Sequence, residues 1–258
     1  MPAVLTRLIA AEFRKLCTTR LWLWLLLVSA VWTAGYTALA TALSGRPGGL
    51  TPALSGAAGQ HALFAIGAGG AAPLAAILAA AGTAGEFRHR TAAATFLATP
   101  RRARVIAAKL TIYLLAGTGY GVACIAVGAA VALPWLSARG TPLSLATHGN
   151  LAVLGAVVIS AALFGMTGAG LGALLGSEII TIAGLLLFLY VAEPLLSHIS
   201  ALSSWTLYLP GVAADGLTQA SQAGVRLLPP WQGGLVLAGW AVVIAAAGTV
   251  LTVRRDIT

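Results

Sequence analysis

Long runs of apolar residues, separated by short polar or charged stretches, dominate the 258-residue chain. A helix that crosses the roughly 30 Å hydrocarbon core of a bilayer needs about 20 such residues. Six runs reach this length, at residues 21–43, 62–84, 110–136, 151–177, 179–196 and 231–253. The pattern predicts an all-α fold in which a single transmembrane domain, residues 1–258, contains six membrane-spanning helices.

Composition excludes several other classes of protein. Hydrophobic residues make up 59% of the chain and charged residues 8%, whereas a soluble domain carries about 25% charged residues. A soluble enzyme and a disordered chain are therefore excluded, and the two cysteines, Cys17 and Cys124, do not form a disulfide framework. The first run exceeds the roughly 7–15 apolar residues of a secretory signal, so we expect a retained membrane anchor.

The basic residues predict the orientation of the six helices. Twelve of them precede the first run, separate the second from the third, or follow the sixth, whereas the other side has only Arg46, Arg139 and Arg226. Because Lys and Arg concentrate in cytoplasmic segments, we expect both termini in the cytoplasm. These residues face anionic lipid and account for the net charge of +9 without a nucleic-acid partner.

Residues 1–20 form an amphipathic helix by their spacing. One apolar stripe contains Leu5, Ile9, Phe13 and Leu16, at the spacing of one helical face. Such a helix lies in the cytoplasmic interface, although a simple basic segment before the first span remains an alternative.

The cytoplasmic segment 86–109 begins with good helix formers and is interrupted at Thr99 and Pro100. Thr99 suits an N-cap and Pro100 the first position of the third spanning helix. The basic residues that follow, Arg101, Arg102 and Arg104, lie at the positive end of that helix dipole, where cations are unfavourable. Lipid phosphate, orientation in the membrane or a protein partner must therefore account for them.

The outer segment 197–230 is the longest stretch between spans, and it remains apolar. Trp205, Tyr208 and Trp231 are aromatic residues of the kind that lie at membrane interfaces. We expect a partly inserted, re-entrant extracellular hairpin, with an irregular apolar loop as the alternative.

Patterns for catalysis, cofactor binding and metal binding are missing from the sequence. Neither lysine, Lys15 or Lys109, stands in a Gly-Lys-Ser/Thr pattern, the four histidines have no zinc-ligand spacing, and no Gly-x-Ser-x-Gly occurs. We therefore expect no enzymatic activity from this chain alone. Glu193 is the candidate for a proton relay; the alternative is an interfacial carboxylate at a helix break beside Pro194.

Glycines recur every four residues in two spans. Such ridges allow helix backbones to approach closely, either within one chain or between two copies. The glycines concerned are Gly168, Gly172 and Gly176 in one span, and Gly117 and Gly121 in another.

Two stretches outside the membrane carry a recognisable pattern; the first precedes span one, and the second follows span two. They read Glu12-Phe13-Arg14-Lys15-Leu16 with Thr18-Thr19-Arg20 and Trp22, then Gly85-Glu86-Phe87-Arg88-His89 with Thr91, Thr95-Phe96-Leu97-Ala98-Thr99-Pro100-Arg101-Arg102, Arg104-Val105 and Lys109. These stretches resemble the type-2 permeases of ATP-binding cassette exporters, and the likeness is closest to the actinobacterial branch.

The resemblance implies that two permease chains pair, as a homodimer or heterodimer, in a bacterial cell membrane. Each chain is then served by a separate ATPase subunit, which binds the ATP and Mg²⁺ that this chain does not. The helix after span two docks on that ATPase, and the outer segment caps the exit. The docking residues carried over are Glu86, Arg88, Thr91, Thr95, Pro100 and Arg101.

The function implied is export of a hydrophobic or amphiphilic substrate, such as an antibiotic or a lipid-like compound, powered by the partner's ATP hydrolysis. Two alternatives remain open. One is a membrane sensor or immunity component that transports nothing. The other is a proton-coupled secondary transporter, in which Glu193 would carry the proton.

Overall fold

The computed structural model of the chain describes residues 2–44, 46, 50–88, 102–140, 149–220 and 226–254. These residues form helices and no strand. Six helices are long and apolar enough to cross a membrane, which confirms the predicted all-α fold with six spans. They are Leu21–Leu43, Ala57–Glu86, Ala103–Ala138, Asn150–Leu175, Glu178–Ser197 and Pro230–Arg254.

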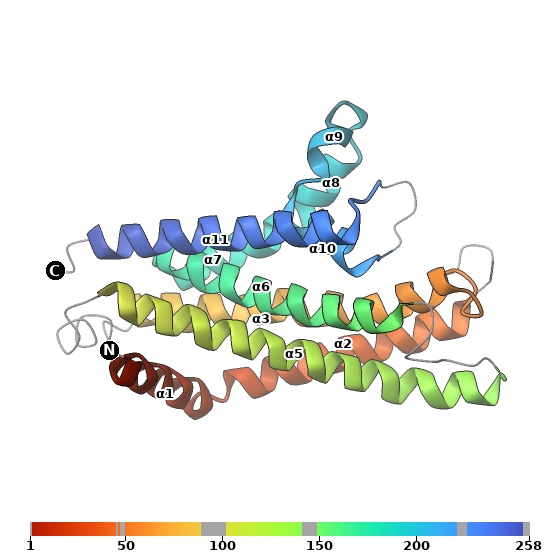
Figure 1. Cartoon of the computed structure of the whole chain (residues 1–258), viewed down its shortest axis with the longest axis horizontal. Coiled ribbons are helices and arrows are strands. Elements are labelled where there is room, and N and C mark those ends of the chain that lie inside the picture. The colour runs from red at the N-terminus through yellow and green to blue at the C-terminus, as the bar shows by residue number, and fades with distance from the viewer. Residues whose placement is uncertain are drawn as a thin grey trace.

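The long helices run side by side as one elongated bundle (Figure 1). They are α1 (Pro2–Thr18), α2 (Leu21–Leu43), α3 (Ala57–Arg88), α5 (Arg102–Ala138), α6 (Asn150–Leu175) and α11 (Pro230–Arg254). At one end, here called the basal end, lie α1, the end of α3, the start of α5 and the end of α11. The opposite end is the distal end. The distribution of basic residues leads us to expect the basal end in the cytoplasm.

Helix α6 occupies the centre of the bundle and contacts α3, α5 and α11. Small residues make this position possible. A Cβ at Gly117 or Gly121 of α5 would collide with the backbone of α6, and a Cβ at Gly168 would collide with Ala76 of α3. Gly172 similarly faces Ala80 and Thr83 at 3.0 Å. All four glycines therefore hold helix contacts within this chain.

Gly176 has a different role from the other glycines of its series. It follows the last residue of α6, has φ of 66°, and donates its N–H to the carbonyl oxygen of Gly172. A glycine with this backbone conformation ends a helix without steric cost. Gly176 thus sets the turn from α6 into the fifth span rather than a helix contact.

Helices α3 and α5 are longer than the apolar runs predicted, with 32 and 37 residues. At 1.5 Å per residue they extend about 48 and 56 Å, well beyond the roughly 30 Å hydrocarbon core. Helix α5 contains Pro134 and continues through it to Ala138. The helix gives up one hydrogen bond there, close to its end.

The fifth span has three parts: α7 (Glu178–Leu187), a π-helical turn η1 (Phe188–Ala192) and α8 (Glu193–Ser197). The chain stays helical on both sides of Pro194, and the irregular turn lies just before it. Pro194 has no N–H to donate, and a wider turn before it absorbs this loss: Glu193 donates its N–H to Phe188, five residues back. π-helical turns of this kind are frequent at functional sites.

The segment after this span contains η2 (Ser200–Leu202), α9 (Ser203–Thr206) and α10 (Pro210–Thr218). Helices α8 and α9 project sideways from the bundle, whereas α10 lies beside α11 (Figure 1). The indole N–H of Trp240 on α11 donates to the carbonyl oxygen of Tyr208, at 2.8 Å. The segment thus returns to the bundle through a defined contact.

Candidate functional site

Four charged side chains meet at the basal end and form what we call the basal charge cluster: Glu12, Lys15, Glu86 and Lys109. The Lys109 ammonium lies 2.6 Å from Glu12 Oε2 and 2.8 Å from Glu86 Oε1. Lys15 lies 2.6 Å from Glu12 Oε1 and 2.8 Å from Glu86 Oε1. Both lysines of the chain thus bridge the same two carboxylates, and the cluster is electrically neutral.

The basal charge cluster is buried on the side of Lys109 and open on the side of Lys15. The side chain of Lys109 is 3% exposed and that of Lys15 is 46% exposed. Partial burial opposes the charge on Lys15, but hydrogen bonds to Glu12 and Glu86 outweigh it and raise its pKa. Each carboxylate therefore has a cation on both its buried and its open side.

The cluster joins α1 to the two helices that flank segment 89–101. Glu12 and Lys15 come from α1, Glu86 from the end of α3 and Lys109 from the first turns of α5. Of the apolar stripe predicted for α1, Leu16 packs against the core, whereas Phe13 is 55% exposed. Buried Glu12 therefore lies on the side of α1 toward the bundle, and its ion pairs hold the helix together with the packing of Leu16.

A second ion pair lies at the same end of the bundle. Arg88, in the last turn of α3, donates from Nη1 to Glu178 Oε2 at 3.1 Å. Glu178 is the first residue of α7, so the pair links the end of the second span to the start of the fifth. Both side chains are accessible, and Arg88 is 60% exposed.

The structure brings two of the predicted docking residues to the basal end, in separate ion-pair systems. Glu86 belongs to the basal charge cluster, and Arg88 pairs with Glu178. Thr91, Thr95, Pro100 and Arg101 lie outside the described residues, as does most of the expected coupling helix.

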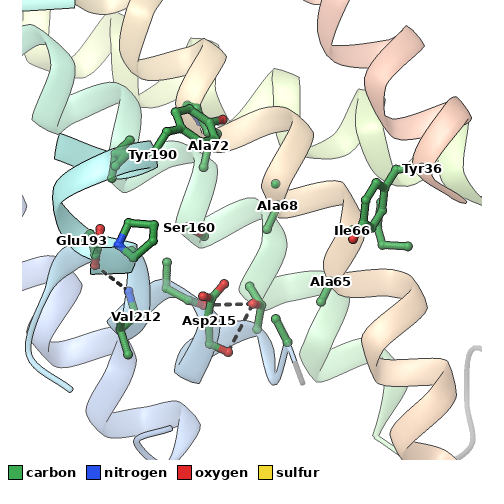
Figure 2. Close-up of a pocket in the computed structure, with 18 of the residues that line it drawn as sticks. Tyr36, Ala65, Ile66, Ala68, Ala72, Ser160, Tyr190, Glu193, Val212 and Asp215 are labelled. Carbon is green, nitrogen blue, oxygen red and sulfur yellow. Dashed lines mark hydrogen bonds between the residues drawn. The ribbon is translucent and has the colours of Figure 1, made fainter. Parts of the chain in front are cut away.

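The distal half of the bundle contains a cavity of about 430 Å³. Its walls come from α2, α3, α6, the η1–α8 turn and α10 (Figure 2), and are mainly apolar. We call it the distal cavity. Its volume lies within the range of about 300–1,000 Å³ that is usual for small-molecule sites.

Two buried polar side chains line the distal cavity without a hydrogen-bond partner for one of their atoms. Glu193 is 4% exposed, and its Oε1 accepts the backbone N–H of Val212 at 2.8 Å (Figure 2). The backbone N–H of Gly211 also acts on this carboxylate, whose Oε2 is buried without a partner of good hydrogen-bond geometry. Ser160 on α6 is fully buried, and its hydroxyl is likewise unsatisfied. A buried polar atom without a partner is costly. Five other such atoms lie elsewhere in the described bundle, and these two are the ones in the cavity wall.

Asp215 adds a second carboxyl group from α10 (Figure 2). Burial, reinforced by the negative charge of Glu193, raises the pKa of Asp215 to about 7. The cavity therefore contains two carboxyl groups, one of which changes its charge near neutral pH.

Aromatic side chains lie at the accessible edge of the distal cavity. Trp32 and Tyr36 on α2 stack with their ring centroids 6.1 Å apart. Both rings are partly exposed, as is Tyr190 of η1, with exposed fractions between 39% and 56%. The cavity thus combines an aromatic edge with an acidic interior.

The sequence predicts neither the basal charge cluster nor the distal cavity, although it contains the residues of both. Lys109 counted as one of many basic residues outside the spans, and Ser160 as an ordinary residue of an apolar run. Lysines and acidic residues are rare in this chain, which has only two lysines and six acidic residues. Four of these eight residues form the basal charge cluster, so their rarity was the sequence feature that could have indicated it.

A comparison with protein-family models and with characterised proteins finds no match for this chain. Among the residues that the structure describes, no group of three or more His, Cys, Asp or Glu side chains is arranged to hold a metal ion. The two sites described above are therefore the basis for the functional argument.

Proposed function

We propose that the chain is the transmembrane subunit of an ATP-binding cassette exporter. It would move a hydrophobic or amphiphilic substrate outward through the membrane, using ATP hydrolysed by a separate subunit. The observation that carries the proposal is the basal charge cluster, which ties α1 to the helices on both sides of segment 89–101.

A subunit driven by a partner needs a stiff connection between the surface that contacts the partner and the membrane helices. The cluster supplies one, since it joins three helices through a buried, neutral set of ion pairs. The Arg88–Glu178 pair extends the connection to the fifth span. Force applied near segment 89–101 would therefore reach α1, α3, α5 and α7 together.

The distal cavity supports the same proposal from the other end of the bundle. It is mainly apolar and reaches the surface beside exposed aromatic side chains. Such a site suits a substrate that partitions into lipid. The mechanism proposed is alternating access, in which two permease chains enclose the substrate path and the partner's ATP cycle moves them.

The test is co-purification of the tagged full-length chain in mild detergent from its native host, followed by ATPase assays. We compare wild type with Arg88→Ala and Glu178→Ala. Arg46→Ala at the distal end is the matched control, because Arg46 is also an exposed arginine. We expect an ATPase subunit to co-purify with wild type and with the control, and its stimulation by substrate to fall in both basal variants.

Two outcomes would contradict the proposal. If no ATPase co-purifies under conditions that preserve a known transporter complex, the chain does not work as an exporter subunit. If an ATPase binds but no transported compound stimulates it and no efflux is measured, the sensor or immunity role takes precedence.

A second candidate, a proton-coupled secondary transporter, is favoured by one specific observation. Glu193 lies four residues before the end of a 20-residue span and has an unsatisfied carboxylate oxygen. Buried acidic groups of this kind carry protons in many transporters. Efflux that collapses with the proton gradient, continues without ATP and is lost in Glu193→Gln would support this candidate over the exporter.

A further inference from the structure

The distal cavity presents an acidic group that lacks a counter-ion among the described residues. Among the described residues, the carboxylates that form ion pairs are those of Glu12, Glu86 and Glu178, all at the basal end. Glu193 forms none of these ion pairs. Its Oε1 is held by the backbone of Val212, so the carboxyl group is fixed in place, while Oε2 is buried at the cavity wall without a hydrogen-bond partner. At low dielectric the Coulomb attraction between a cation and this carboxylate is stronger than in water, and binding requires that this attraction exceed the cost of desolvating the cation.

The surroundings of Glu193 restrict the kind of cation that fits. The wall is mostly apolar, with Ile66, Phe164 and Leu189 among its lining residues, so a small hydrated metal ion would lose its water for too few oxygen ligands. An organic cation with apolar or aromatic groups would instead bury those groups against the wall. The rings of Trp32, Tyr36 and Tyr190 suit its passage, since aromatic faces attract organic cations.

We propose that the distal cavity binds amphiphilic organic monocations, with the Glu193 carboxylate as counter-ion and the unsatisfied Ser160 hydroxyl as an additional polar contact. The inference deepens the proposed function, on which it rests for its transport role, by naming the substrate class. The cavity volume of about 430 Å³ is sufficient for a compound of drug-like size. The same acidic group would repel anionic compounds.

The binding test uses the full-length chain in nanodiscs and two probes of the same shape and opposite charge, tetraphenylphosphonium and tetraphenylborate. We expect wild type to bind the cation and not the anion. Glu193→Gln keeps an acceptor oxygen for the N–H of Val212 but removes the charge, and we expect it to weaken cation binding on the order of tenfold or more. Partition of each probe into lipid is common to both proteins and cancels in the comparison.

A second pair of variants tests the aromatic edge independently of the charge. Trp32→Ala should weaken cation binding, whereas Trp205→Ala on the projecting helix α9, outside the cavity lining, should leave it unchanged. Equal binding of the two probes, or cation binding that survives both Glu193→Gln and Trp32→Ala, would overturn the inference.

The same preparations separate this inference from the proposed function. Lack of cation binding in a chain that still co-purifies with its ATPase overturns the substrate class and leaves the exporter proposal intact. Cation binding that depends on Glu193, in a chain without any ATPase partner, supports the site and contradicts the exporter proposal.

Discussion

The ammonium group of Lys109 lies 2.6 Å from the carboxylate of Glu12, although the two residues are 97 positions apart. Both side chains are almost completely buried, on different helices. A buried ion pair is weak support for stability as such, but removal of one partner is strongly destabilising. The pair therefore fixes where α1 sits, and any change to it should be detectable.

The two lysines of the basal charge cluster provide a matched comparison, since they bridge the same carboxylates from different depths. We expect Lys109→Met to lower the free energy of unfolding by about 3 kcal/mol, because two buried carboxylates lose their inner cation. Lys15→Met should cost below about 1 kcal/mol, since Lys15 is half exposed and screened by solvent. Thermal unfolding in detergent, followed by tryptophan fluorescence, measures both; equal losses would contradict the asymmetry.

Gly117 and Gly119 test the close packing of α5 on α6. A Cβ at Gly117 would overlap the backbone of Ala161, whereas one at Gly119 would meet nothing within 4 Å. We expect Gly117→Ala to cost about 1–3 kcal/mol through overpacking, and Gly119→Ala to be neutral or to stabilise by up to about 1 kcal/mol through helix propensity. The melting temperatures of the two variants should move apart, and a common shift would refute the contact.

Asp215 should give cation binding a dependence on pH. Its pKa of about 7 means that the carboxyl group becomes negative as the pH rises through neutrality, so affinity for tetraphenylphosphonium should increase several-fold between pH 6 and 8. We expect Asp215→Asn to flatten this dependence. The measurement is the dissociation constant at each pH, in wild type and variant.

The other titratable groups that line the cavity are Glu193, His198, Tyr36 and Tyr190. A positively charged imidazole would also repel a cation, so the effect of His198 has to be separated from that of Asp215. His198→Asn is therefore the control. If it removes the pH dependence and Asp215→Asn does not, the assignment to Asp215 is wrong.

The Arg88–Glu178 pair can be tested by exchange of its charges. Each single change, Arg88→Glu or Glu178→Arg, places like charges at about the distance of the present pair and should lower substrate-stimulated ATPase activity. The double exchange should restore it. Because the pair is exposed, stability should change by about 1 kcal/mol or less in all three variants, and activity that stays low in the double exchange would argue for a direct contact of Arg88 with the partner.

The spans were predictable because length and hydropathy are properties of single segments. All six appear, and α2 matches its apolar run of residues 21–43. The full lengths of α3 and α5 were harder to predict. Their basal ends are charged turns, which resemble a polar loop when only hydropathy is considered.

The two sites were not predictable, because each depends on which helix faces meet. Lys109 reads as one more basic residue near a membrane surface until α1 places Glu12 beside it. Pro194 suggested an interrupted helix, and nothing in the local sequence distinguishes a break from the π-helical turn that keeps Glu193 in a helix. Ser160 could not be singled out from the sequence, because its distinguishing feature is a buried hydroxyl without a hydrogen-bond partner, which only the structure shows.

Helix α3 touches both sites as one uninterrupted rod. It lines the distal cavity from Ala62 to Pro73 and carries Glu86 and Arg88 at its other end. Pro73 lies near its midpoint, and proline is the usual pivot at which helices bend. Its basal arm of 15 residues is about 22 Å long, so a change of about 10° at Pro73 displaces Arg88 by roughly 4 Å. A bend at Pro73 would therefore link the wall of the cavity to the ion pairs at the basal end.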